Sequence, residues 1–187
     1  MKHAGIKDHI INIASTLFYK NGYNSTGINE IISEAGIAKA TLYNHFKSKE
    51  DICLAYLKFK NTSFLQDLKS FCNSKKEGND RLIAMFDFLS QFYSDKDFNG
   101  CWCIKTVAEI PKENTRIRKE IQYQKSLFID FIQELIEQNR PDLADHDSNP
   151  LAKRIYLLYE SAVSESHLHE DNWPIKESRG LCRLLLE

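Results

Sequence analysis

Residues 28–46 read INEIISEAGIAKATLYNHF, a pattern that predicts two short helices joined by a tight turn. Gly36 lies between the two helices, and glycine accepts the backbone angles that let one helix cross the other. In the second helix, Leu42 and Phe46 are four residues apart and therefore face inward together. The remaining face is short, polar and almost free of acidic residues, as expected of a helix that enters the major groove of DNA. An ordinary corner in a helical bundle is the alternative interpretation of this spacing.

Helical periodicity continues on both sides of this stretch, and the alternation typical of strands is nearly absent. Upstream, apolar residues three and four apart predict a first helix that ends at Asn21-Gly22. These apolar residues are Ile6, Ile10, Ala14, Leu17 and Phe18. Downstream, Ser48 followed by Asp51 is similar to a capping box and predicts the start of a long helix that reaches Phe71.

The rest of the chain predicts further helices separated by polar or proline-containing segments. The expected helices are Leu82–Tyr93, Cys101–Ile110, Glu113–Gln138, Pro150–Glu170 and Pro174–Glu187, with a polar loop at Asp142–Asn149. The sequence therefore predicts an all-α fold of about nine helices. We expect a three-helix domain at residues 1–48, and a long helix that joins it to a second helical domain at residues 49–187.

The composition of the 187 residues is that of an ordinary globular protein, with 42% hydrophobic and 27% charged residues. No apolar run approaches the roughly 20 residues that a membrane span needs, and the N-terminus lacks the apolar core of a signal peptide. We therefore expect a cytoplasmic protein with no membrane partner, whose five cysteines are reduced thiols. Residues 1–60 carry eight lysines against five acidic residues, which suits a domain that binds nucleic acid.

Residues 11–57 closely resemble, in order and spacing, the DNA-binding domain of the TetR family of transcriptional regulators. The matching elements are Ala14…Leu17-Phe18, Gly22-Tyr23, Ser25-Thr26, Ile28, Ile31, Glu34-Ala35-Gly36-Ile37, Thr41-Leu42-Tyr43-Asn44-His45-Phe46 and Lys49-Glu50. Ile32, where many relatives carry alanine, departs from the pattern at a packing position. The resemblance implies that Ile28–Glu34 and Lys39–Phe46 form a helix-turn-helix, with the second as the recognition helix. It also implies a repressor that leaves its operator when a small molecule binds the C-terminal domain.

The resemblance further implies which side chains contact double-stranded DNA. Candidates for base edges are Lys39, Ala40, Thr41 and Asn44. Candidates for phosphates are Thr26, Tyr43, His45 and Lys49. A helix N-cap is the alternative role for Thr26, and partial burial is the alternative for Tyr43. Because no arginine precedes Arg81, a contact to guanine must come from Lys39, the backbone or water.

One short recognition helix buries too little surface for tight binding, so we expect a homodimer on a palindromic operator. In the TetR family, the last two helices of each subunit pair in a four-helix bundle. The residues that this resemblance implies at the interface are Ile155, Leu158, Tyr159, Ala162, Val163, Leu181, Leu184 and Leu185. Packing within the subunit is the alternative for some of them.

Beyond residue 61 the resemblance extends only to the order of the helices, so side-chain chemistry alone indicates the effector. Aromatic residues are frequent there, and a cavity that they line between helices would bind an apolar or planar small molecule. The candidates are Phe88, Phe92, Trp102, Tyr123, Phe128 and Tyr156. Trp102, beside Gly100, is the best single candidate for a cavity wall. An ordinary aromatic core is the alternative.

Cys101 and Cys103 suggest a second kind of regulator, one that senses oxidants or electrophiles. A helix N-terminus favours thiolate, and Lys105 is nearby in the sequence. Buried packing is the alternative, because free cysteines are among the most buried residues. An all-α ligand-binding module that does not bind DNA is the alternative from another functional class.

Other kinds of site have little support in the sequence. His167 and His169 are two residues apart and therefore lie on different faces of a helix, so we expect no metal site. There is no phosphate-binding glycine-rich loop and no nucleophile elbow. We therefore expect neither a cofactor nor an enzymatic activity.

Overall fold

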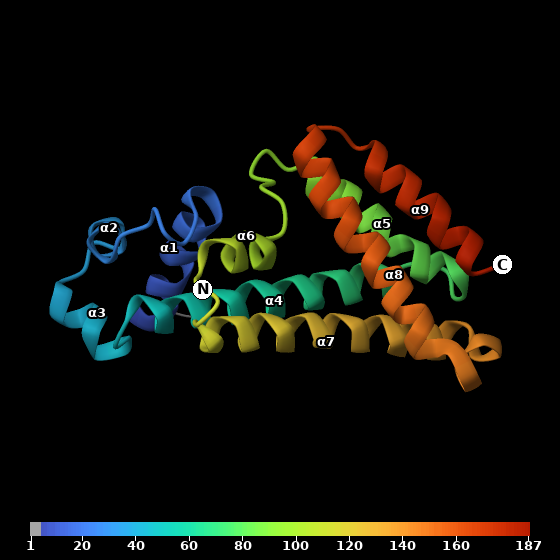
Figure 1. Cartoon of the computed structure of the whole chain (residues 1–187), viewed down its shortest axis with the longest axis horizontal. Helices are drawn as coiled ribbons and strands as arrows, with labels where there is room; N and C mark the ends of the chain where they lie inside the picture. Colours follow the sequence, from blue (N-terminus) through green and yellow to red (C-terminus); the bar gives the residue numbers. More distant parts are fainter. Residues whose placement is uncertain (1–4) are drawn as a thin grey trace. The chain divides into compact units, whose positions relative to one another are not determined.

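The computed structural model describes residues 5–187, except for the side chains of residues 143–148 (Figure 1). Within this range nine helices follow one another without a strand, which confirms the predicted all-α fold. Residues 1–4, part of the segment used to argue against a signal peptide, lie outside the described residues. Two compact units are present, one reaching Ser63 and including Trp102–Tyr123, the other formed by Phe64–Cys101 and Gln124–Glu187.

The first unit begins with α1 (Ile6–Asn21), α2 (Ile28–Glu34) and α3 (Lys39–His45). Their bounds match the predicted helices, and their inward residues Ile10, Ala14, Phe18, Ile31 and Leu42 are buried. Gly22 has φ 92° where α1 ends, and Gly36 has φ 61° in the turn between α2 and α3. Both angles lie in the left-handed region that favours glycine, so the expected tight turn is confirmed.

Two long helices run through both units: α4 (Lys49–Asn73) and α7 (Thr115–Asn139). The start of α4 is capped as predicted, because the backbone N–H of Asp51 donates to Ser48 Oγ at 3.1 Å. The short helix α6 (Trp102–Glu109) completes the first unit. Each of these two helices therefore contributes residues to both units.

The second unit contains α5 (Asn79–Tyr93), α8 (Pro141–His169) and α9 (Trp173–Leu185). Helix α9 packs along both α8 and α5 (Figure 1). An ion pair from Arg179 Nε to Asp87 Oδ1, at 2.7 Å, joins α9 to α5. Much of the core of this unit is made of aliphatic and aromatic residues, among them Leu82, Met85, Phe86, Leu89, Ile155, Ala162 and Ile175.

The predicted loop at Asp142–Asn149 is wrong, because α8 already begins at Pro141 and continues through Pro150. Pro141 occupies the first turn, where the fixed φ of proline suits a helix and its missing N–H costs nothing. The polar residues that follow include no glycine, so nothing in the backbone ends the helix. Pro150 removes one backbone hydrogen bond at an exposed position, and the helix continues past it.

The boundary between the compact units differs from the predicted domain boundary at residue 48. The first unit also takes in the start of α4, all of α6 and the start of α7. The division into a DNA-binding domain and an effector domain stays a prediction about function.

Candidate functional site

Helix α3 presents most of the residues predicted to contact DNA on an exposed surface. Lys39, Ala40, Asn44 and His45 are exposed, and Thr41 and Tyr43 are half-buried. On the opposite side, Leu42 has no exposed surface and Phe46 is 4% exposed, so both hold the helix to the core. The fold therefore brings six of the eight candidates together on one helix. The partial burial expected as the alternative for Tyr43 is also observed.

Contacts from α1 and α2 hold the helix-turn-helix in place. The His9 ring Nε2 lies 3.0 Å from the backbone oxygen of Ala35, at the end of α2. Glu30 closes the start of α2, since its Oε2 accepts the Gly27 N–H at 3.2 Å and its Oε1 accepts Asn21 Nδ2 at 3.3 Å. This role of Glu30 was not predicted from the sequence, although a glutamate three residues after a helix start is a known signal.

Thr26 cannot contact a phosphate as predicted, because it has no exposed surface. Its hydroxyl donates to the Gly22 oxygen at 2.8 Å inside the loop between α1 and α2. The N-cap of α2 is Gly27, so the alternative role for Thr26 is also wrong. The hydroxyl instead satisfies a backbone carbonyl at the end of α1.

Lys49 is turned toward the loop between α1 and α2. Its Nζ lies 4.4 Å from the Tyr23 ring centroid and donates to the Asn24 oxygen at 3.4 Å. Burial lowers the pKa of Lys49, and burial also raises the pKa of Tyr23 to about 12. These contacts give Lys49 a structural role at the start of α4, and its contact with a phosphate stays a prediction.

Hydrogen bonds join helix α6 to the loop that follows α1. The carboxylate of Glu109 accepts the Asn24 N–H at 2.6 Å, and Asn24 Nδ2 donates to the Glu109 backbone oxygen at 2.7 Å. A Cβ at position 22 would lie 2.5 Å from Glu109 Oε1, so this approach requires Gly22. Lys105 Nζ donates to the Tyr19 oxygen at 3.0 Å, which places its ammonium on α1.

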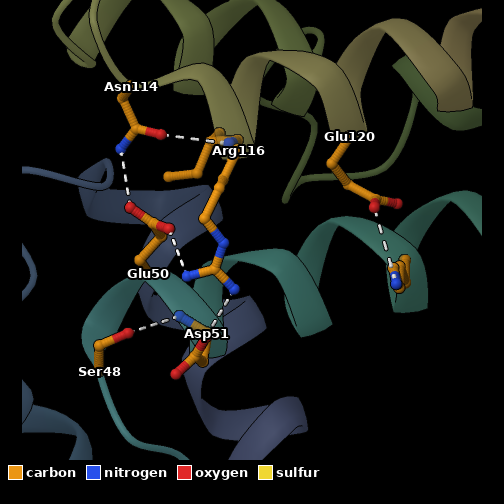
Figure 2. A network of polar contacts seen from close by, with 8 residues as sticks. Ser48, Glu50, Asp51, Asn114, Arg116 and Glu120 are labelled. Carbon is orange, nitrogen blue, oxygen red and sulfur yellow. Dashed lines mark hydrogen bonds and ion pairs between the residues drawn. The ribbon is translucent and has the colours of Figure 1, made fainter.

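A polar network joins the first turns of α4 and α7 (Figure 2). Arg116 contacts Glu50 Oε1 at 2.7 Å and Asp51 Oδ1 at 3.0 Å, and Asn114 Nδ2 donates to Glu50 Oε2 at 3.1 Å. The hydrogen bond from Arg116 holds the pKa of Asp51 below its usual value. Three residues separate the end of α3 from the start of α4, so this network lies close to α3 along the chain.

The six residues predicted to line an effector cavity do not form one group. Phe88, Phe128 and Tyr156 belong to an aromatic cluster of the second unit, in which Phe64 contacts Phe88 at 6.1 Å and Phe128 at 5.3 Å. Phe92 packs instead on Phe98, with ring centroids 5.4 Å apart. Trp102 and Tyr123 belong to the other compact unit, and Tyr123 is 59% exposed, so it is not an interior wall.

Tyr159 contributes a polar group to this aromatic cluster. Its ring lies 5.0 Å from that of Phe128 and 5.8 Å from that of Phe86, and the residue is 2% exposed. Its hydroxyl has no hydrogen-bond partner among the described residues. Burial raises the pKa of this phenol well above its usual value, so it stays a neutral donor. A buried donor without an acceptor is costly unless a ligand or water completes it.

Cys101 lies in a buried polar cluster with Lys125 and Glu160. Lys125 Nζ is 3.3 Å from Cys101 Sγ and 2.5 Å from Glu160 Oε1, and the thiol is 3.7 Å from Glu160 Oε2. Burial raises the pKa of Glu160 to about 7. The cation beside Cys101 is thus Lys125, whereas the expected partner Lys105 bonds to Tyr19. Cys103 is also buried, at 2% exposure, and none of the five cysteines is joined to another.

The predicted dimer interface is wrong for four of its eight residues. Ile155, Tyr159, Ala162 and Val163 are each at most 6% exposed, so they belong to the core of the subunit itself. Leu181, Leu184 and Leu185 are exposed, and Leu158 is half-buried. Three exposed apolar residues were missed, namely Leu157, Leu168 and Trp173. The spacing Leu157, Ser161, Ser164 and Leu168 marks one face of α8 and is a signal that could have found two of them.

Two other expectations concern metal ions and membranes. Among the described residues, no group of three or more His, Cys, Asp or Glu side chains is arranged to hold a metal ion. None of the helices in the described part of the chain is both long and apolar enough to span a membrane.

Comparisons with known proteins match nearly the whole helical chain. Residues 10–56 match the family described as bacterial regulatory proteins, tetR family, and residues 78–181 match the tetracyclin repressor-like C-terminal domain. The HTH-type transcriptional regulator QacR of Staphylococcus aureus is 39% identical over 148 residues, which cover 57% of this chain and 79% of QacR.

Two further matches support this finding. A fatty acid metabolism regulator protein of Bacillus subtilis is 28% identical over 112 residues, and the match covers 60% of this chain but only 56% of that protein. The crystal structure of SCO4454, a TetR-family transcriptional regulator from Streptomyces coelicolor, has a TM-score of 0.86 at 23% identity. The match covers 98% of this chain and 89% of the SCO4454 chain, so the two chains share a fold.

Proposed function

We propose that this chain, which belongs to the TetR family of bacterial regulatory proteins, is a dimeric repressor released from a palindromic operator by a small ligand. The observation that carries the proposal is the exposed polar face of α3, held to the core by Leu42 and Phe46. A repressor of this kind acts on DNA in the cytoplasm.

Contacts with DNA are assigned by side-chain chemistry and exposure. Lys39, Ala40, Thr41 and Asn44 contact base edges, where an amide favours adenine and a lysine favours guanine. Tyr43 and His45 contact phosphates and fix the position of the helix on the duplex. Lys39 is the base-reading cation in this set, so the operator depends on it for any guanine contact from a side chain.

A second copy of the chain supplies the other recognition helix. Helix α3 has only seven residues, which is too little surface for specific binding by one subunit. Exposed apolar residues lie on the two C-terminal helices, on α8 at Leu157 and Leu168 and on α9 at Leu181 and Leu184. Pairing of these faces between two subunits removes them from water and forms a four-helix bundle.

The effector binds beside the aromatic cluster of the second unit. Tyr159 offers a neutral hydroxyl, and the rings of Phe64 and Phe128 offer edges and faces for an apolar or planar ligand. The proposed ligand is therefore a small aromatic or apolar molecule that carries one hydrogen-bond acceptor for Tyr159.

Release from DNA requires the ligand to favour one arrangement of the recognition helices over another. Helices α4 and α7 run from the ligand-binding unit into the first unit, where Arg116 joins their first turns and Glu109 joins α6 to the loop that follows α1. A shift of either helix therefore moves the base of α3. The two recognition helices then lose the spacing of one DNA turn that a palindrome demands.

Selection from random duplex DNA followed by sequencing tests this proposal. We expect the purified protein to enrich a palindrome, and Lys39→Ala and Asn44→Ala each to relax defined positions within each half-site. Lys69→Ala, which removes an exposed lysine from the second unit, is the matched control and should leave the motif unchanged. Binding should also weaken steeply as salt rises. Salt-independent binding with no enriched sequence would instead support a helical ligand-binding module that does not bind DNA.

Thiol sensing is a second candidate function, favoured by the 3.3 Å contact between Lys125 Nζ and Cys101 Sγ. An ammonium at this distance favours the thiolate that reacts with electrophiles. Cys101→Ser should then abolish operator release by an electrophile such as N-ethylmaleimide and leave DNA binding intact. If N-ethylmaleimide releases the Cys101→Ser variant from the operator as readily as it releases the Cys103→Ser variant, thiol sensing through Cys101 is excluded.

A further inference from the structure

A cavity of about 270 Å³ lies in the second unit, apart from the aromatic cluster around Tyr159. It is formed by the end of α5, the loop that follows it and the last turn of α8. Its lining residues are Tyr93, Asp95, Phe98, Ser166, His167 and Glu170. The lining contains two carboxylates and no lysine or arginine, so the cavity is electronegative.

Aromatic rings and a glycine give this cavity its walls. The ring of Phe98 packs edge-on against Tyr93 at 5.2 Å and against His167 at 6.0 Å. Gly100 has φ 71°, and a Cβ there would lie 2.9 Å from His167 Cδ2. The loop can approach α8 this closely only because residue 100 is glycine. The two aromatic walls are therefore held in place before any ligand binds.

Two carboxylates belong to the lining between these walls, those of Asp95 and Glu170. Ser166 also belongs to the lining, but it has no exposed surface and its hydroxyl donates to the Val163 oxygen at 3.3 Å, so it offers the cavity no open polar group. Asp95 uses Oδ1 to accept the Asp97 N–H at 3.0 Å, so its other carboxylate oxygen is the one left for a ligand.

Glu170 is held in an unusual backbone conformation at the rim. With φ 51°, it is the one non-glycine residue with positive φ among the described residues. Glycine or asparagine would occupy this left-handed position at the end of α8 with less strain. A glutamate here places a second carboxylate at the cavity, and function is a common reason for keeping such strain.

We propose that this cavity binds a primary alkylammonium ion. The ammonium group supplies three N–H donors, and the carboxylates of Asp95 and Glu170 supply charged acceptors for them. The alkyl chain and the charge both suit the faces of the Phe98 and Tyr93 rings. A metal ion fits less well, since no group of three ligating side chains is present among the described residues. A quaternary ammonium has no N–H to donate to either carboxylate.

Isothermal titration calorimetry of the full chain without DNA tests the proposal, with n-butylammonium as the probe. Its matched comparisons are 1-butanol, which has no charge, and butyltrimethylammonium, which has no N–H donor. We expect n-butylammonium to bind at least tenfold more tightly than 1-butanol and at least threefold more tightly than butyltrimethylammonium. Equal affinity for n-butylammonium and 1-butanol would overturn the proposal.

The double variant Asp95→Asn/Glu170→Gln locates the binding. This variant removes both charges and should weaken n-butylammonium binding at least tenfold. The amide that replaces the Asp95 carboxylate keeps an oxygen that can accept the Asp97 N–H. Asp130→Asn/Glu134→Gln removes the same charge from the exposed face of α7 and should change affinity less than twofold. If circular dichroism shows that the double variant is unfolded, Glu170→Gln alone should still weaken binding at least threefold. Equal affinities of the cavity and control variants would refute the site.

Discussion

Replacing Glu160 by glutamine should remove a distinct pH dependence from the stability of this protein. Burial raises the pKa of Glu160 from 4.5 to about 7 in the folded state, even though Lys125 Nζ lies 2.5 Å from its carboxylate. An acid with a raised folded pKa binds its proton more tightly in the folded state than in the unfolded state. Its contribution is therefore fully present below pH 4.5 and is lost as the pH rises toward 7.

The size of this effect follows from the shift in pKa. Each unit is worth about 1.4 kcal/mol, so the titration of Glu160 removes about 3 kcal/mol of stability between pH 4.5 and pH 7.5. Only 16% of the Glu160 side chain and 18% of the Lys125 side chain are exposed, so solvent screens the site little. Desolvation thus outweighs the attraction of Lys125 for the ionised carboxylate.

Urea denaturation at one chain concentration and at pH 4.5, 5.5, 6.5 and 7.5 measures this contribution. The free energy of unfolding of the unmodified protein minus that of Glu160→Gln should fall by about 3 kcal/mol across this range. Glu134→Gln, which changes an exposed carboxylate on α7, is the control for the loss of one negative charge. A difference for Glu160→Gln that is flat, or that rises with pH, would refute the reasoning.

Three further predictions concern packing, assembly and the contact between α6 and α1. Leu42→Ala empties a site with no exposed surface and should destabilise the protein by about 2–5 kcal/mol in urea. DNA binding should be lost at temperatures where the unmodified protein still binds. A change below about 1 kcal/mol would contradict the burial of Leu42. Leu168→Glu/Leu184→Glu places charges on residues that are 71% and 65% exposed in the single chain. It should shift the proposed dimer to monomer in sedimentation velocity without loss of helix; an unchanged dimer would place the interface elsewhere. Glu109→Ala removes the acceptor of the Asn24 N–H and should lower the free energy of unfolding in urea by about 1 kcal/mol. It should also weaken the response of operator binding to ligand; full induction in this variant would show that α6 does not transmit the signal.

The helices of the first unit were predictable because local signals agree with one another there. The start of α4 at Ser48 and Asp51, the turn at Gly36 and the inward pair Leu42 and Phe46 all follow from residues within four positions of each other. Each of these signals has a local physical cause, whether a cap, a left-handed glycine or helical periodicity. Helix α3 and the polar residues that it exposes therefore follow from sequence.

The start of α8 was not predictable in the same way. Pro141 and Pro150 each suit the first turn of a helix, and composition alone favoured the second. Prolines and polar residues bias a helix boundary, but packing of the rest of the helix against α9 and α5 outweighs that bias.

The candidate sites show the same difference between local and distant information. Sequence identified Cys101 and the aromatic residues, but not that Lys125 and Glu160 lie beside the thiol or that the Tyr159 hydroxyl is buried without a partner among the described residues. These contacts join positions 24 to 59 residues apart, which helical periodicity does not relate.

The sequence by itself determined the class of fold, the position of the helix-turn-helix and the face of α3 that is free to contact DNA. Only the tertiary structure decided that Thr26 is buried, that Ile155 and Val163 lie in the core while Leu168 and Leu184 stay exposed, and that a strained Glu170 lines a separate cavity. The physical reason is that hydrogen-bond caps and helical spacing act within one or two turns. Burial depends instead on which other helices cover a side chain, and that is settled only when the whole chain packs.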